Sequence, residues 1–256
     1  HALIPFLPYG VAAGLFIIAI IALGLIGDVP RSPISGAQRP VHQIVQGWRY
    51  VMNNKMVLGA ITLDLFAVFL AGATALFPVY ARDILQVGET GLSQLAMAPA
   101  IGAVVSATWF SFRPLRTGVG PKMLVAVAVF GVATIVFGFS TSMPLSLAML
   151  FIVGAADMFS VYIRQSLVQL HTPDEMRGRV SSASLLTISA SNEGGDAFSG
   201  WLASVVGPVA AVVAGGVGAI VTVALWARLF PVLRNTRTFD PRALQEPPEQ
   251  TLQEQI

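Results

Sequence analysis

The sequence predicts an all-α protein, a polytopic bundle of transmembrane helices, and three observations lead to this prediction. Hydrophobic residues make up 55% of the 256 residues and charged residues only 11%, against about 25% charged in ordinary globular proteins. The mean hydropathy is +0.73. Seven stretches are apolar and long enough to cross a hydrocarbon core of about 30 Å as helices.

The small number of charges also excludes whole classes of function. A soluble protein of this size needs more polar surface than 15 basic and 13 acidic side chains can cover. A formal net charge of +2 is too low to indicate a nucleic-acid-binding protein. Because the chain contains no cysteine, disulfides, thiolate metal sites and cysteine nucleophiles are excluded as well.

The first predicted span runs from Tyr9 to Ile26 and carries no charged residue. No basic segment or small-residue cleavage site precedes it, so the pattern does not fit a signal peptide. The chain opens at His1 and is apolar from its second residue. We therefore interpret it as a piece of a longer or processed protein.

Residues 28–55 form a segment of a different kind. Helix breakers from Pro30 to Pro40 come first, and apolar residues at helical spacing follow between Val41 and Met52. Polar and basic residues occupy the other faces of that helix. This pattern predicts an amphipathic helix that lies in the membrane interface, with a plain connector helix as the alternative.

Six further spans are predicted within residues 56–229. In lipid they must be helical, because each backbone amide needs a partner within its own segment. Their approximate bounds are Met56–Tyr80, Gly91–Phe112, Met123–Ser142, Pro144–Ile163, Val180–Val206 and Val209–Ala227. Residues 230–256, rich in Pro, Gln and Glu, have the composition of a disordered tail.

The span Val180–Val206 is polar enough to score poorly on hydropathy, but the distribution of basic residues supports it. With seven crossings, only Arg82 among the basic residues falls on the outer side. The inner side then holds Arg31, Arg39, Arg49, Lys55, Arg113, Arg116, Lys122, Arg164, Arg177, Arg179, Arg228, Arg234, Arg237 and Arg242. Without this crossing the last four would change sides, against the positive-inside rule. The pattern thus predicts a C-terminus on the cytoplasmic side.

Four carboxyl groups lie inside the predicted spans, where an ionisable side chain costs about 3 kcal/mol on insertion scales and calls for a role. They belong to Asp64, Asp157, Glu193 and Asp196. The helix faces that carry these residues should point toward the bundle interior, a partner helix or a water-filled cavity rather than lipid. We therefore treat all four as candidate proton-coupling or substrate-binding residues.

Helical spacing places polar partners beside two of these groups. Asp157 shares one face with Ser160 and Arg164, which makes Arg164 a candidate charge partner. Asn192 belongs to the polar stripe that contains Glu193 and Asp196. A carboxyl group that alternates between an apolar environment and a neighbouring cation can bind and release protons. The alternative is a fixed polar network that only ties helices together.

Catalytic and metal-binding motifs are missing from the sequence. The three histidines, His1, His42 and His171, all fall outside the predicted spans, so no His–carboxylate set forms within the membrane. There is no HExxH, Walker or nucleophile-elbow motif. We therefore expect no enzyme activity, no metal site and no cofactor.

Two motifs resemble a known transporter family. Residues 164–180 read RQSLVQLHTPDEMRGRV and resemble the loop between the tenth and eleventh helices of major facilitator superfamily transporters. Residues 189–220 read SASNEGGDAFSGWLASVVGPVAAVVAGGVGAI and resemble the drug- and siderophore-export branch of that family. The resemblance extends over nearly the whole chain.

The resemblance implies that the seven spans are helices six to twelve of a twelve-helix transporter. Residues 1–27 would then be the last helix of the N-terminal bundle, 28–55 the cytoplasmic linker, 56–229 the C-terminal six-helix bundle and 230–256 a cytoplasmic tail. It also implies alternating access, usually driven by protons, with Arg177 and Arg179 as a cytoplasmic gate. Simple positive-inside anchoring is the alternative for these two arginines.

The resulting hypothesis is a piece of a proton-coupled exporter of siderophores, drugs or other amphipathic molecules in a bacterial inner membrane. We expect lipid, protons, such a substrate and the missing N-terminal half as partners. A second hypothesis is a non-transporting membrane subunit or a lipid-handling protein whose buried acids are structural. A shared wet cavity would favour transport, whereas completely paired acids would favour the structural alternative.

Overall fold

A computed structural model describes residues 7–25, 40–115 and 117–239, and every regular element within these ranges is a helix. The chain divides into two units, residues 1–39 and residues 40–256. The predicted breakers Pro30, Pro33 and Gly36 lie outside the described residues, as do Arg116 and the tail beyond residue 239.

The first unit contains one described helix, α1 (Leu7–Gly24), which has no acidic residue in its first turn and no basic residue in its last. Its side chains from Phe16 to Leu25 are exposed, and most of them are large and apolar. An exposed apolar surface of this kind suits a lipid or protein environment.

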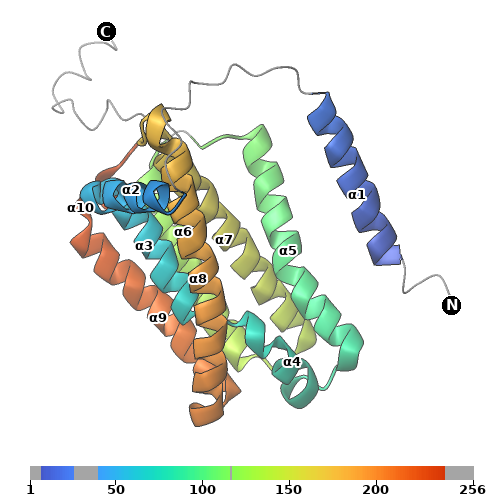
Figure 1. Cartoon of the computed structure of the whole chain (residues 1–256). Coiled ribbons are helices and arrows are strands. Elements are labelled where there is room, and N and C mark those ends of the chain that lie inside the picture. The colour runs from blue at the N-terminus through green and yellow to red at the C-terminus, as the bar shows by residue number, and fades with distance from the viewer. Residues whose placement is uncertain (1–6, 26–39, 116, 240–256) are drawn as a thin grey trace, which may run out of the picture. The chain divides into compact units, whose positions relative to one another are not determined.

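In the second unit, α2 (Pro40–Asn53) lies across the ends of α3 (Lys55–Leu70) and α8 (Asp174–Val206), as Figure 1 shows. It buries Gly47 and Val51 and leaves Val45 and Met52 exposed. A Cβ atom at position 47 would collide with the backbone carbonyl group of Arg179 on α8. Because glycine has no Cβ, it lets the two helices touch through their backbones.

Helix α3 is shorter than the sequence suggested. The Asn54 side chain caps its start, accepting hydrogen bonds from the backbone amides of Met56 and Val57 at 3.1 and 3.2 Å. The helix ends at Leu70, and a 3-10 turn (Thr74–Leu76), α4 (Phe77–Val79) and a π turn (Tyr80–Ile84) follow.

The span predicted over residues 56–80 lies within the apolar helical stretch Lys55–Ile84, but it is not one continuous α-helix. Pro78 supplies a physical reason for the interruption. A proline lacks the amide hydrogen, and its ring collides with the carbonyl group four residues earlier in a continuous α-helix. At Pro78 that carbonyl belongs to Thr74, where the 3-10 turn begins. In the structure Pro78 stands at the start of α4, where a helix tolerates proline.

Four long helices complete the bundle together with α8. They are α5 (Gly88–Phe112), α6 (Val119–Phe139), α7 (Met143–Leu170) and α9 (Pro208–Leu229), and the short α10 (Pro231–Asn235) follows. Within the described residues, five helical stretches are long and apolar enough to cross a membrane: Lys55–Ile84, α5, α6, α7 and α9. Helix α8, with its many polar residues, is not among them, and α1 contributes only a shorter apolar stretch, Ala12–Gly24.

Close backbone contacts hold these helices together. Gly102 of α5 packs on the backbone of α7, and Gly131 of α6 packs on Gly216 of α9. The interruption after α3 lies between two more glycines: a Cβ at Gly195 would lie 2.9 Å from the Phe69 carbonyl oxygen, and one at Gly215 would lie 2.6 Å from that of Leu70. The end of α3 is thus fixed between α8 and α9.

Candidate functional site

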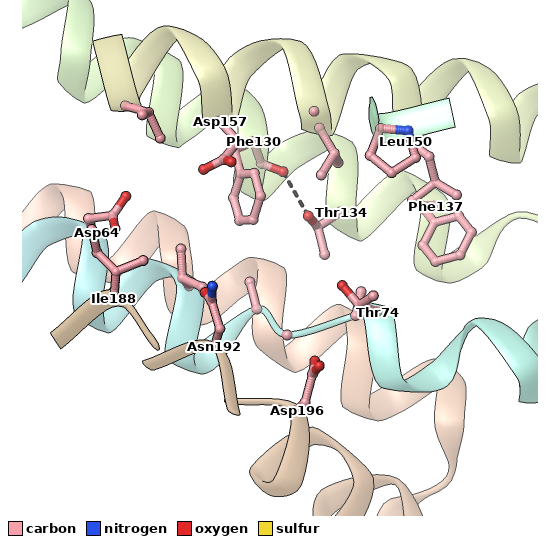
Figure 2. Close-up of a pocket in the computed structure, with 18 of the residues that line it drawn as sticks. Asp64, Thr74, Phe130, Thr134, Phe137, Leu150, Asp157, Ile188, Asn192 and Asp196 are labelled. Carbon is pink, nitrogen blue, oxygen red and sulfur yellow. Dashed lines mark hydrogen bonds between the residues drawn. The ribbon is translucent and has the colours of Figure 1, made fainter. Parts of the chain in front are cut away.

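A cavity of about 390 Å³ lies between α3, α6, α7 and α8 (Figure 2). The sequence predicts six candidate proton-coupling or substrate-binding residues, and five of them line this cavity: Asp64, Asp157, Arg164, Asn192 and Asp196. These residues come from three helices, α3, α7 and α8, of which α3 is far from the other two in sequence. The fold thus brings most of the predicted polar residues to one shared opening.

A buried ion pair joins α3 to α7 at one end of the cavity. The Nη1 atom of Arg164 lies 2.9 Å from Oδ2 of Asp64, and the two side chains are 3% and 7% exposed. The alternative Asp157–Arg164 pair does not form, because seven residues of α-helix separate the two positions by about 10 Å along the axis. Arg164 therefore connects two helices rather than two turns of one.

The ion pair leaves hydrogen-bonding capacity unused. Within the described part of the chain, Nε and Nη1 of Arg164 have no hydrogen-bond partner of good geometry, although Nη1 lies close to the Asp64 carboxylate. The hydroxyl group of Ser160, which is also buried, has none either. Buried donors without partners mark places where water or a ligand atom completes the structure.

Asp157 and Asp196 occupy the cavity without an ion pair to any other described residue. Both side chains are half-buried. Figure 2 shows that Asp196 extends from α8 toward Thr74, which begins the 3-10 turn after α3. Asn192, one helical turn before Asp196, also lines the opening.

Glu193 is the candidate that the structure does not bring to the cavity. Its side chain is exposed and does not contribute to the lining. The polar stripe predicted on α8 thus divides, since Asn192 and Asp196 face the cavity and Glu193 does not. A turn of 100° per residue separates neighbouring positions on the helix and accounts for the division.

The two candidate gate arginines lie where α7 turns into α8. The Arg177 guanidinium pairs with Asp174 at 2.8 Å and donates a hydrogen bond to the Gln169 carbonyl at 3.0 Å. Arg179 contacts the Met176 sulfur at 3.5 Å. Neither arginine lines the cavity, so both lie apart from the carboxyl groups.

Several lining residues were not predicted from the sequence. Thr74, Thr134, Phe130 and Phe137 carry no charge, and spans of this kind contain many such residues. The Thr134 hydroxyl donates a hydrogen bond of 2.8 Å to the Phe130 carbonyl within α6 (Figure 2). Pro78 was the available signal for Thr74, because a proline four residues on predicts the interruption that exposes it.

The described residues contain no group of three or more His, Asp or Glu side chains that could hold a metal ion. The cavity instead combines carboxyl groups, one arginine, two threonines and apolar walls. Such a lining can bind a small molecule of mixed polarity and can take up or release protons.

Comparison with known proteins identifies the family. Residues 5–192 match the Major Facilitator Superfamily. The chain is 31% identical over 171 residues to the multidrug efflux pump Tap of Mycobacterium tuberculosis, covering 66% of this chain and 40% of that protein. It is 25% identical over 240 residues to the enterobactin exporter EntS of Escherichia coli, covering 91% of this chain and 56% of that protein.

The chain spans about half the length of the curated relatives that it matches. The family match covers well over half of the chain and includes the loop at residues 164–180 that carries the resemblance. This family consists of multi-pass membrane transporters and not of enzymes. The chain therefore belongs to the Major Facilitator Superfamily.

Proposed function

We propose that this chain is the C-terminal half, helices six to twelve, of a proton-coupled exporter of drugs, siderophores or other amphipathic molecules. The relatives named for drug efflux and enterobactin export support this proposal. In it, α1 and α8 cross the membrane along with the five apolar stretches. The 33-residue length of α8 and its packing along α3 and α9 support a crossing despite its polar composition.

The observation that carries the proposal is the gathering of three carboxyl groups and one arginine around a single cavity inside an apolar bundle. Ionisable groups within a membrane are costly and commonly mark substrate or proton pathways. In transporters, such sites lie near the centre of the bundle, often where a helix is interrupted. The break between Leu70 and Thr74 adjoins this cavity.

In this proposal Asp64 and Asp157 have different roles in proton coupling. The Asp64–Arg164 pair joins α3 to α7, so a proton on Asp64 removes the charge that holds these helices together. Asp157 faces the same cavity and forms no ion pair with any other described residue. Protonation of either group changes the net charge of the cavity, and this change links proton binding to substrate binding.

The remaining features of the proposal concern orientation and partners. The distribution of basic residues supports a cytoplasmic C-terminus, and the bacterial relatives support a bacterial inner membrane. Arg177 and Arg179 would then lie at the cytoplasmic end, close to the linker helix α2, as a gate. The N-terminal half would complete the cavity and alternate with this half between inward and outward openings.

The structural alternative, in which the acids only tie helices together, requires each acid to have a partner. Asp64 meets that requirement. Asp157 and Asp196 do not, because neither forms an ion pair within the described chain. The incomplete pairing supports transport over a non-transporting subunit or a lipid-handling protein.

The test is proton-driven efflux by the complete transporter reconstituted in liposomes. We expect Asp157→Asn to reduce substrate movement driven by a pH gradient by at least tenfold. Glu193→Gln, which removes the same charge from a side chain outside the cavity, should retain most of the activity. Equal loss in both variants, or full activity in Asp157→Asn, would contradict the proposed coupling site.

A further inference from the structure

The charges around the cavity do not balance. Asp64 and Arg164 pair at 2.9 Å, which leaves Asp157 and Asp196 without an ion-pair partner among the described residues. Every other lining side chain is neutral. The cavity therefore presents two uncompensated carboxyl groups to whatever enters it.

This imbalance matters more in the bundle than it would in water. At the effective dielectric constant of about 20 that is typical near protein groups, the attraction between two charges is about four times stronger than in bulk water. An incoming cation would be drawn to Asp157 and Asp196, whereas an anion would be repelled. Electrostatics alone thus distinguishes two ligands of the same shape.

The apolar walls suit the same kind of ligand. Phe77, Phe130 and Phe137 contribute three aromatic side chains to the lining, beside aliphatic residues such as Val68 and Leu150. Aromatic rings bind apolar groups and also attract cations through the negative potential over their faces. An organic cation with an apolar body fits both properties of this lining.

An unpartnered hydrogen-bond donor indicates that the cavity is a ligand site rather than a packing void. Arg164 lines it, is 3% exposed, and keeps an Nε donor without a hydrogen-bond partner in the described chain. Such a buried donor calls for an oxygen atom from a ligand or from water. This observation is independent of the excess of carboxyl groups.

The two carboxyl groups without partners differ in position. Asp157 faces the region near Asp64, whereas Asp196 lies farther along the cavity, opposite Thr74 at the break after α3 (Figure 2). The Thr74 hydroxyl oxygen can accept a hydrogen bond from a ligand N–H group. Asp196 is thus the carboxyl group best placed to meet a charged ligand without disturbing the Asp64–Arg164 pair.

We infer that the cavity binds amphipathic organic cations in preference to anions, with Asp196 and Thr74 holding the cationic group and Phe130 and Phe137 contacting the apolar body. The inference rests on the proposed function, since it names the class of substrate that this cavity selects. It distinguishes among the drugs and siderophores that the family relationship leaves open.

The test compares two probes of matched shape and opposite charge, tetraphenylphosphonium and tetraphenylborate. Binding is measured by equilibrium dialysis against the complete transporter in lipid nanodiscs, with empty nanodiscs as the blank. We expect the cation to bind at least tenfold more tightly than the anion. Asp196→Asn should reduce affinity for the cation at least tenfold, and Asp196→Glu should restore most of it.

Glu193→Gln provides the matched control, because it removes the same charge from the same helix, three residues away and outside the lining. It should change affinity for the cation less than twofold. Equal binding of both probes would overturn the charge preference, and equal loss in Asp196→Asn and Glu193→Gln would overturn the Asp196 site.

A second measurement separates this inference from the proposed function. If the cation binds as expected but a pH gradient drives no movement of any probe in liposomes, the coupled transport is wrong and the binding site stands. If a pH gradient drives export of the neutral dye Nile red while the two charged probes bind equally, transport stands and the charge preference is wrong.

Discussion

Two polar regions of this bundle share one sequence feature, a carboxyl group within a predicted span, but their structures differ. Between α3 and α7, Asp64 and Arg164 lie almost fully buried and pair across the helices. On α8, Glu193 lies exposed outside the cavity lining and has no ion pair among the described residues. Both regions place a carboxyl group in the middle of a long helix.

The difference shows that a charge inside a predicted span does not by itself reveal its role. A buried pair is costly to break, because removing one partner leaves the other charge desolvated. An exposed carboxyl group gains little from its surroundings and loses little when it is neutralised. The first region should therefore govern stability, and the second should be open to contacts with other groups.

The largest expected effect follows from breaking the buried pair. Arg164→Met removes the cation and leaves the Asp64 carboxylate without a partner, so we expect the free energy of unfolding to fall by about 3–5 kcal/mol. Denaturation of the complete transporter in detergent, followed by circular dichroism, measures the change.

The control is the double variant Asp64→Asn/Arg164→Met, which removes both charges. It should recover most of the lost stability, because a neutral pair of similar volume carries no unpaired charge. The single variant Asp64→Asn completes the comparison. If the double variant lost as much unfolding free energy as the two single variants together, the two side chains would not stabilise each other.

An intermediate effect is expected on the buried side of α8. Gly195→Ala would place a Cβ atom 2.9 Å from the Phe69 carbonyl oxygen at the end of α3. Because backbone atoms cannot move aside as a side chain can, we expect a loss of about 1–3 kcal/mol in unfolding free energy.

Gly200→Ala is the matched control on the same helix, since a Cβ atom there meets nothing within 4 Å. Alanine favours helix by about 1 kcal/mol over glycine, so this variant should be neutral or slightly more stable. If both variants lost stability equally, the close approach of α8 to α3 would not be the cause.

The smallest effect on stability is expected on the exposed side of α8. Glu193→Gln changes an exposed side chain without an ion pair in the described chain, so unfolding free energy should stay within about 0.5 kcal/mol of the parent. The same detergent denaturation measures it. If Glu193→Gln lost as much unfolding free energy as Arg164→Met, the two regions would not differ in their contribution to stability.

The sequence was informative about where helices occur and poor at showing how they meet. Apolar runs with at most one charged residue identified α5, α6, α7 and α9 to within several residues, because lipid leaves such runs few alternatives to a helix. The polar α8 forms as one helix from Asp174 to Val206, although its crossing of the membrane remains a prediction. The interruption after Leu70 was missed despite the signal from Pro78.

The candidate site was predicted in part for similar reasons. Charged residues in an apolar run are conspicuous, so four lining residues could be named in advance, and the polar stripe on α8 added Asn192. The partner of Arg164 could not, because a helical period relates positions within one helix and carries no information about the facing helix. Neutral lining residues such as Thr74 and Phe130 have no distinguishing pattern and emerge only from the packing.

The contact between Gly47 on α2 and the backbone of Arg179 on α8 has a practical consequence. Any tilting of α8 must be transmitted to α2, whose outer side carries the exposed Met52. The chain has no cysteine, so Met52→Cys offers a unique attachment point for a spectroscopic label. Such a label would report rearrangement of the bundle from a position outside the cavity lining.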